Sequence, residues 1–244
     1  MTTKADISLV RSLADKQARK ETGLFVAEGG KIVNELAGSS FTVRRIFAAG
    51  SIAHLYPGAE EVSSKELKRM SSFKSPADVI AIVEIPHYEL PEEIGAELTL
   101  ALDDVQDPGN IGTIIRIADW FGIRDILCSH ATADAFSPKV VQATMGAILR
   151  VRMHYCNLAG ILSGVSTPAY GAFMSGESIY DLSLSRKGVI VMGNEGNGIS
   201  KEIEKIVTKR IAIPPYPAGR ARCSESLNVA SAVAVICSEF RRRG

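Results

Sequence analysis

Short apolar runs bounded by turn residues dominate the carboxyl-terminal part of the chain. They lie at residues 98–102, 126–128, 169–172, 189–192 and 211–213. Runs of this length without apolar–polar alternation are typical of strands that are buried on both faces of a parallel sheet. Residues 110–121 differ, because their apolar side chains recur at helical spacing. The pattern therefore predicts an α/β domain.

Two further segments complete this picture. Residues 227–240 are apolar on nearly every side and rich in alanine, which predicts a helix enclosed by protein. In the amino-terminal part, helical and extended stretches alternate instead. It has helix-compatible or helical stretches at 4–20, 31–36 and 64–70, and extended stretches at 23–29, 44–48 and 79–84. Strands alternating with helices predict a second, smaller α/β module.

A linker separates the two parts. Residues 86–97 contain Pro86, Pro91 and a cluster of glutamates. Proline restricts its own backbone and that of the residue before it, so the segment is unsuited to a helix or an internal strand. We expect two domains, residues 1–88 and residues 97–244.

Composition and net charge limit the class of protein that the chain can be. The chain is 46% hydrophobic and 23% charged, as in ordinary globular proteins, and its net charge is +1. A protein that wraps nucleic acid is often strongly basic, so RNA binding here would need local basic patches. Residues 1–88 carry 12 Lys and Arg against 10 Asp and Glu, whereas residues 89–244 carry 16 against 17.

The four cysteines are scattered, and neither they nor the histidines have the spacing of metal ligands. This favours reduced thiols in a cytoplasmic protein, with no bound metal. No apolar run approaches the ~18 residues of a membrane span, so no membrane association is expected.

Three polar loops follow predicted strands, where ligands of open α/β sheets bind. The first loop has a turn at 107–109, then Asn110 as a candidate helix cap and Arg116 inside the helix. Arginine presents a planar fork of donors to a phosphate. A capped helix with an ion-paired arginine explains the same residues, so both interpretations stay open.

The second loop carries three glycines between residues 193 and 198, with Glu195 among them. Glycine lets the backbone approach a ligand closely, although a plain tight turn fits equally well. The third loop leaves Ile213-Pro214 and reaches Ser226 and Asn228 ahead of an apolar helix, where a serine helix cap is the simpler alternative. No GxGxxG follows the first strand of either part, which argues against an ordinary Rossmann site.

Taken in order, the three loops resemble the SpoU (TrmH-like) RNA methyltransferases of the SPOUT superfamily. The first, 110–116, is similar to N-x-G-x-x-x-R, the second to G-N-E-x-x-G, and the third to I-P followed by S-L-N-V at 226–229. Residues 144–147 are similar to the family's (S/T)-M-G-A segment. Residues 15–19 and 23–29 resemble its amino-terminal RNA-binding module. The resemblance spans nearly the whole chain.

The resemblance implies a carboxyl-terminal trefoil-knotted domain with a parallel sheet, preceded by a small RNA-binding domain. It implies transfer of a methyl group from S-adenosylmethionine to a ribose 2′-hydroxyl of structured RNA, without a metal, by a homodimer. The residues matched to cofactor binding are Met192, Gly193, Asn194, Gly196, Ile213, Ser226, Leu227 and Asn228.

The resemblance also assigns catalytic roles. Arg116 would contact the RNA phosphate and help to deprotonate the hydroxyl, although arginine is a poor base because its guanidinium binds its proton very tightly. Asn110 would orient the ribose or support Arg116. Glu195 and Asn228 would complete the polar lining, and Ser226 would support the loop.

The expected RNA contacts are Arg116, Lys16 and Arg19, the last two from the amino-terminal module. The third loop is longer than the family pattern and adds Arg220 and Arg222. We expect this pair to reach RNA phosphates.

Three alternatives remain. A non-catalytic RNA-binding protein on the same scaffold predicts loss of Asn110, Arg116, Glu195 or Asn228, and all four are present. An unrelated α/β enzyme that holds phosphate on 193–198 would need a P-loop lysine or a catalytic dyad, and neither is evident. Base methylation fits the superfamily, but the first motif favours ribose. The two-domain arrangement favours ribosomal RNA over transfer RNA.

Overall fold

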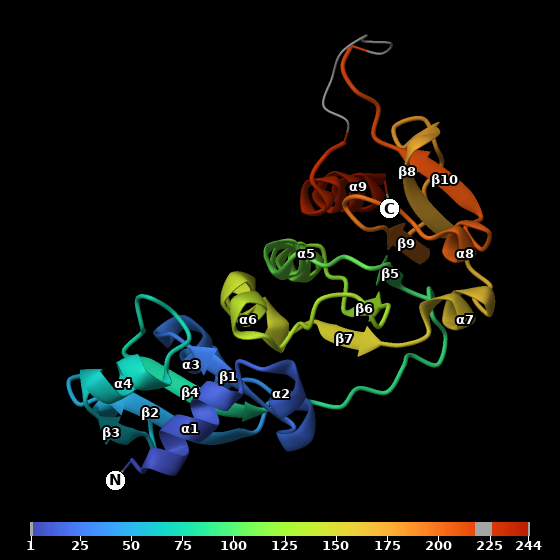
Figure 1. Cartoon of the computed structure of the whole chain (residues 1–244). Coiled ribbons are helices and arrows are strands. Elements are labelled where there is room, and N and C mark those ends of the chain that lie inside the picture. The colour runs from blue at the N-terminus through green and yellow to red at the C-terminus, as the bar shows by residue number, and fades with distance from the viewer. Residues whose placement is uncertain (1, 218–225, 244) are drawn as a thin grey trace. The chain divides into compact units, whose positions relative to one another are not determined.

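The computed structural model describes residues 2–217 and 226–243 (Figure 1). The chain divides into two compact units. Unit 1 comprises Met1–His87 with Asp134–Arg150, and unit 2 comprises Tyr88–Ala133 with Val151–Gly244. Unit 1 thus includes residues 134–150, which lie within the range 97–244 expected for the second domain.

Unit 1 is built on a four-stranded sheet with the order β1-β4-β2-β3. β4 (Val79–Glu84) pairs antiparallel with β1 (Leu24–Glu28) and with β2 (Val43–Ala49), and β3 (Glu60–Val62) pairs parallel with β2. The helical elements are α1 (Lys4–Ser12), α2 (Lys16–Thr22), α3 (Gly30–Leu36), α4 (Ser64–Met70) and the 3₁₀ turn η1 (Ala53–Leu55). Phe47, Leu67 and Ile80 belong to the core between sheet and helices.

Helix caps explain where the first helices begin and end. Thr3 with Asp6 and Ser63 with Glu66 form reciprocal capping boxes at α1 and α4. The carboxylate of Asp15 accepts hydrogen bonds from the N–H groups of Gln17 and Ala18. Asp15 therefore starts a new helix, and the helix-compatible stretch 4–20 is two helices rather than one.

Residues 134–150 form α6 (Pro138–Thr144) and the 3₁₀ turn η2 (Ala147–Leu149) within unit 1. The ring of Phe136 lies 5.0 Å from that of Phe25 on β1. Ion pairs of 2.6 Å join Arg19 to Asp134 and Glu35 to Arg150. The segment is thus held by both apolar and charged contacts to the amino-terminal module.

Unit 2 contains a six-stranded, wholly parallel sheet with the order β10-β8-β9-β5-β6-β7. Its strands are β5 (Leu98–Leu102), β6 (Asp125–Cys128), β7 (Arg152–Tyr155), β8 (Ala169–Ser178), β9 (Gly188–Met192) and β10 (Lys209–Ala212). Every residue of β5 and β9 is buried, which confirms the interpretation of their apolar runs.

The helices of unit 2 form two pairs. α5 (Pro108–Trp120) contacts α9 (Val229–Arg243), and α7 (Leu158–Ser163) contacts α8 (Lys201–Glu204) (Figure 1). Ala101, Val189 and Val191 pack with α7 and α8, so the sheet is covered on this face. α9 is not enclosed on every side as expected, because Ser231 and Ser238 are exposed.

The elements that the pattern missed are short or polar. β7 lies at the edge of the sheet and alternates polar with apolar residues, α7 has 6 residues, and α8 has 4. β8 continues to Ser178 through exposed residues, since there it pairs only with β10. Among the helices described, none is long and apolar enough to cross a bilayer.

Candidate active site

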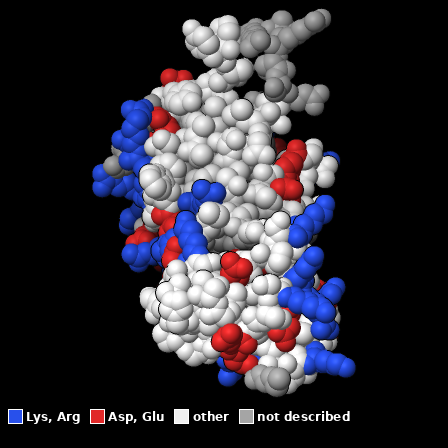
Figure 2. All heavy atoms as spheres, turned by 90° about the vertical axis from the view of Figure 1, so that its left-hand side faces the viewer, with Lys and Arg blue, Asp and Glu red and all other residues white. Residues whose placement is uncertain are grey.

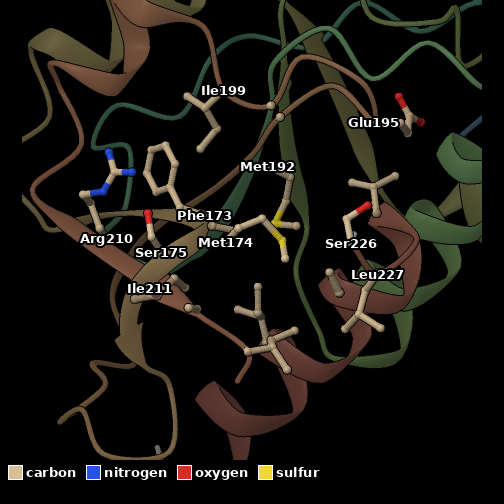
Figure 3. Close-up of a pocket in the computed structure, with 18 of the residues that line it drawn as sticks. Phe173, Met174, Ser175, Met192, Glu195, Ile199, Arg210, Ile211, Ser226 and Leu227 are labelled. Atoms are coloured by element: carbon tan, nitrogen blue, oxygen red, sulfur yellow. The ribbon is translucent and has the colours of Figure 1, made fainter. Parts of the chain in front are cut away.

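One cavity of about 1150 Å³ lies where β9 and β10 of unit 2 end (Figure 3). β8, the glycine loop 193–198, the exit from β10 and the first turns of α9 all contribute to its wall. Met192, Gly193, Asn194, Glu195, Gly196, Ile213, Ser226 and Leu227 line it, so the cavity brings most of the predicted site residues together.

Much of the cavity wall is apolar. Met174, Met192, Ile211 and Leu227 are among the apolar residues that line it (Figure 3). At one side the guanidinium of Arg210 stacks on the ring of Phe173, 3.6 Å from its centroid. Apolar walls with a few oriented polar groups are typical of small-molecule and cofactor sites.

The glycine loop closes on itself. Asn194 and Gly198 exchange two main-chain hydrogen bonds, of 3.0 and 2.9 Å. The side-chain oxygen of Asn194 accepts from the N–H groups of Gly196 and Asn197. A Cβ on Gly193 would lie 2.2 Å from the carbonyl carbon of Gly198, so only glycine fits there. The polar atoms of the Asn194 side chain are therefore used within the protein, so the expected cofactor contact of this cavity-lining residue would fall to its main chain.

Asp104 fastens this loop to the end of β5. Its carbonyl oxygen accepts a 2.8 Å hydrogen bond from the Asn194 side chain, and its φ is +58°, a left-handed conformation. The Ser129 hydroxyl donates to its carboxylate at 2.5 Å. Beside it, buried Asp103 accepts from the N–H of Ser200 at 2.7 Å. Neither aspartate was among the predicted residues, although two consecutive acids after an apolar strand are a usable signal.

Three of the predicted catalytic residues form one hydrogen-bonded cluster. The side-chain amide of Asn110 donates to Glu195 at 2.7 Å, and that of Asn228 donates to the Asn110 oxygen at 2.9 Å. The Asn228 oxygen in turn accepts from the N–H groups of Ala230 and Ser231 at the start of α9. We call Asn110, Glu195 and Asn228 the polar triad.

The cap of α5 is not Asn110. The carboxylate of Asp107 accepts from the Asn110 N–H at 2.8 Å, which makes Asp107 the capping residue. The Asn110 side chain is consequently left to make the contacts of the polar triad.

Arg116 and Ser226 stand apart from the triad. Both are exposed, and neither makes a side-chain hydrogen bond or ion pair with a residue that the structure describes. Arg116 projects from α5 with its guanidinium free to meet an anion. The capping-serine and ion-paired-arginine alternatives therefore find no support in the described part of the chain.

The residues expected to contact RNA differ in placement. Lys16 is exposed at the start of α2. Arg19 is only 3% exposed and is bound to Asp134 and to the Leu13 carbonyl, at 2.7 Å, so a surface contact with RNA is not supported. Arg220 and Arg222 lie outside the described residues. Among residues 2–217 and 226–243, no group of His, Cys, Asp and Glu could hold a metal ion.

Solved structures share this whole architecture. A structure described as a putative RNA methyltransferase of the TrmH family from Porphyromonas gingivalis is 38% identical, with a TM-score of 0.90 over 100% of both chains. An AdoMet-bound rRNA methyltransferase from Sinorhizobium meliloti is 28% identical, with a TM-score of 0.85 over 99% of this chain and 97% of that one. The fold is thus the one found in RNA methyltransferases of known structure.

Comparison with models of protein families identifies the family. The model of the SpoU rRNA Methylase family matches residues 97–238, and that of the MRM3-like substrate binding domain matches residues 4–81. The chain belongs to the SpoU rRNA methylase family, as its motifs predicted. It is also 28% identical to the 23S rRNA (guanosine(2553)-2′-O)-methyltransferase RlmP of Bacillus subtilis, over 95% of this chain and 94% of that protein.

Proposed function

We propose that the chain transfers a methyl group from S-adenosylmethionine to a ribose 2′-hydroxyl of ribosomal RNA. The observation that carries this proposal is the junction of two features at Glu195, which lines the apolar cavity and also belongs to the polar triad. Related proteins such as RlmP are named for the same reaction on 23S rRNA.

The cavity suits the cofactor. Its apolar side chains, Met192, Ile211 and Leu227 among them, offer a slot for an adenine ring. Main-chain groups near Gly193 and Ile213 would supply hydrogen bonds at the ring edge, and Gly193 lets the loop approach closely. When bound, the cofactor supplies a methyl group on a positively charged sulfur. The protein then has chiefly to align the ribose oxygen with it.

The polar triad and Arg116 would perform that alignment. Asn110 has its amide orientation fixed on both sides, by Glu195 and Asn228, and so presents a rigid polar group to the ribose. Arg116 would hold an RNA phosphate beside the reacting nucleotide. Arginine is a poor base, so we assign Arg116 to positioning and polarising the hydroxyl rather than to taking its proton.

The test is methyl transfer from labelled S-adenosylmethionine to unmodified ribosomal RNA, followed by nucleoside analysis. Arg116→Ala should lower kcat at least ~100-fold while leaving cofactor affinity unchanged, and Arg116→Lys should recover part of the loss. The matched control is Arg11→Ala, an exposed arginine of unit 1. A methylated base, or full activity of Arg116→Ala, would refute the proposal.

Three finer properties belong to the same proposal. We place the reaction in the cytoplasm and the chain in a homodimer, with unit 2 knotted as the resemblance implies. The cavity supports the knot, since it joins loop 193–198 to the segments on either side of residues 218–225. Trp120 supports the dimer, because its large apolar side chain is 85% exposed on α5. It is also the chain's single tryptophan, so its fluorescence reports on this surface alone. Its fluorescence emission should shift to the blue as concentration rises through the dimer range.

A further inference from the structure

A second concave site lies at the opposite edge of the same sheet. It has a volume of about 350 Å³ and is lined by Ala96, Glu97, Leu98, Gly122, Arg124, Arg186, Lys187 and Arg241. Leu98 begins β5, Arg124 immediately precedes β6, and Lys187 precedes β9, so the site faces the amino ends of these strands. We call it the basic pocket. A five-residue strand such as β5 puts it about 17 Å from the loops of the active site.

Three of the four cations of the basic pocket lack a carboxylate partner in the described part of the chain. These are Arg124, Arg186 and Lys187, and all three are exposed. Other arginines do pair with a carboxylate. Examples are Arg19, Arg45 and Arg210. Glu97 is the single acid among the lining residues, against four cations. Lys and Arg also gather in groups on the face drawn in Figure 2, with some Asp and Glu among them.

The walls of the basic pocket are held by the protein itself. Arg241 of α9 donates to the carbonyl oxygens of Phe121 and Gly122, at 2.8 and 3.3 Å, where α5 has ended. The Gly188 N–H donates to the Gly95 carbonyl at 2.8 Å, and the Arg124 carbonyl accepts from the Arg152 N–H at 2.7 Å. The backbone under Arg124 and Lys187 is therefore fixed, which reduces the ordering needed to bind an anion.

We propose that the basic pocket binds a backbone phosphate of the RNA substrate, away from the reacting nucleotide. The reason is chemical: several unpaired cations on a fixed backbone, with two arginine forks, match a phosphate group. Such contacts fix the register of an RNA without reading its sequence. They also supply a local basic patch in a chain whose net charge is only +1. The inference rests on the proposed function for the identity of the substrate.

The experiment measures the affinity of the full chain for unmodified ribosomal RNA at several salt concentrations. Each lost phosphate contact reduces the slope of log K against log salt by about 0.7–0.9. The double variant Arg124→Ala with Arg186→Ala should therefore lower the slope by about 1.5 and weaken binding at least ~10-fold. The charge-preserving pair Arg124→Lys with Arg186→Lys should retain most of the slope. Arg241 is left intact because it holds the α5 end.

The control is Lys201→Ala with Lys205→Ala, two exposed lysines of unit 2 that line neither cavity. Cofactor affinity should be unchanged in all variants. An unchanged slope and affinity in the double arginine variant would overturn the inference. So would binding of inorganic phosphate that depends on these arginines while RNA affinity does not, since the pocket would then take a free anion.

Methyl transfer separates this inference from the proposed function. If the unaltered protein methylates RNA but the arginine variants bind it normally, only the inference fails. If the salt slope falls as expected but no ribose is methylated, only the proposed function fails.

Discussion

The side-chain amide of Asn228 donates a hydrogen bond to the side-chain oxygen of Asn110, although 118 positions separate them in sequence. The contact joins the start of α9 to the first turn of α5. Because Asn110 also donates to Glu195, the three loops that follow β5, β9 and β10 meet at a single amide group. Each atom of that amide has a defined partner, so its orientation is fixed before any ligand binds.

Asn228 has two separable tasks. Its oxygen caps α9 by accepting from the Ala230 and Ser231 N–H groups, and its nitrogen holds Asn110. Asn228→Asp keeps the cap and removes the donor, so kcat should fall ~10-fold or more with little change in stability. Asn228→Ala should in addition lose about 1 kcal/mol of unfolding free energy. Steady-state kinetics and urea unfolding measure the two effects. An Asn228→Asp protein with normal kcat would show that the triad does not position the substrate.

Gly193 should tolerate no side chain. A Cβ there would press on the main chain at Gly198, only 2.2 Å away, so Gly193→Ala must displace the loop. We expect cofactor affinity to fall at least ~10-fold and stability by about 1–3 kcal/mol, as for other overpacked sites. Gly164→Ala is the matched control, because Gly164 lies at the end of α7, lines neither cavity, and its Cβ would meet nothing nearer than 3.7 Å. Calorimetric titration with S-adenosylmethionine measures the cofactor affinity of both variants. Equal affinities would contradict the role of Gly193.

The left-handed backbone at Asp104 gives an ordered series of variants. An alanine is strained there by about 1–2 kcal/mol, whereas glycine is not and asparagine is tolerated. Asp104→Ala should therefore be less stable than Asp104→Gly, although both lose the bond from Ser129. Thermal unfolding measures the order. If alanine proved the more stable of the two, the conformation at this position would not be the one described.

Asp6 should make the stability of unit 1 depend on pH. The Arg45 guanidinium, with help from the Thr3 N–H, lowers the pKa of this carboxyl well below its usual range. Because the folded pKa is the lower one, the contribution is present above the unfolded pKa of about 3.9 and is lost as pH falls through the folded value. The stability gap between the unaltered protein and Asp6→Asn should thus be constant near neutral pH and narrow below about pH 4. A gap independent of pH in denaturant titrations would contradict this.

Features that leave a local sequence pattern were predicted, whereas features that depend on contacts between distant residues were not. β5 and β9 were predicted because burial on both faces leaves a local mark, an uninterrupted apolar run. The three members of the polar triad were found through their motifs, although their mutual contacts depend on the fold. The burial of Arg19 was missed since its partner, Asp134, lies 115 positions away. The left-handed backbone at Asp104 was not predicted, because no glycine marks the position and aspartate also adopts the ordinary conformations.

Unit 1 is built from two separate stretches of sequence, which limits where the chain can be divided into fragments that fold. A fragment that stops at residue 88 would leave Arg19 without its carboxylate and Phe25 without the ring of Phe136. A fragment that starts at residue 97 would carry α6 with Val140 and Val141 stripped of their cover. Separately expressed halves should therefore both be prone to aggregate, whereas the module would be rescued by adding residues 134–150 as a peptide. Unit 1 is in this sense completed only after more than half of the chain has been synthesised.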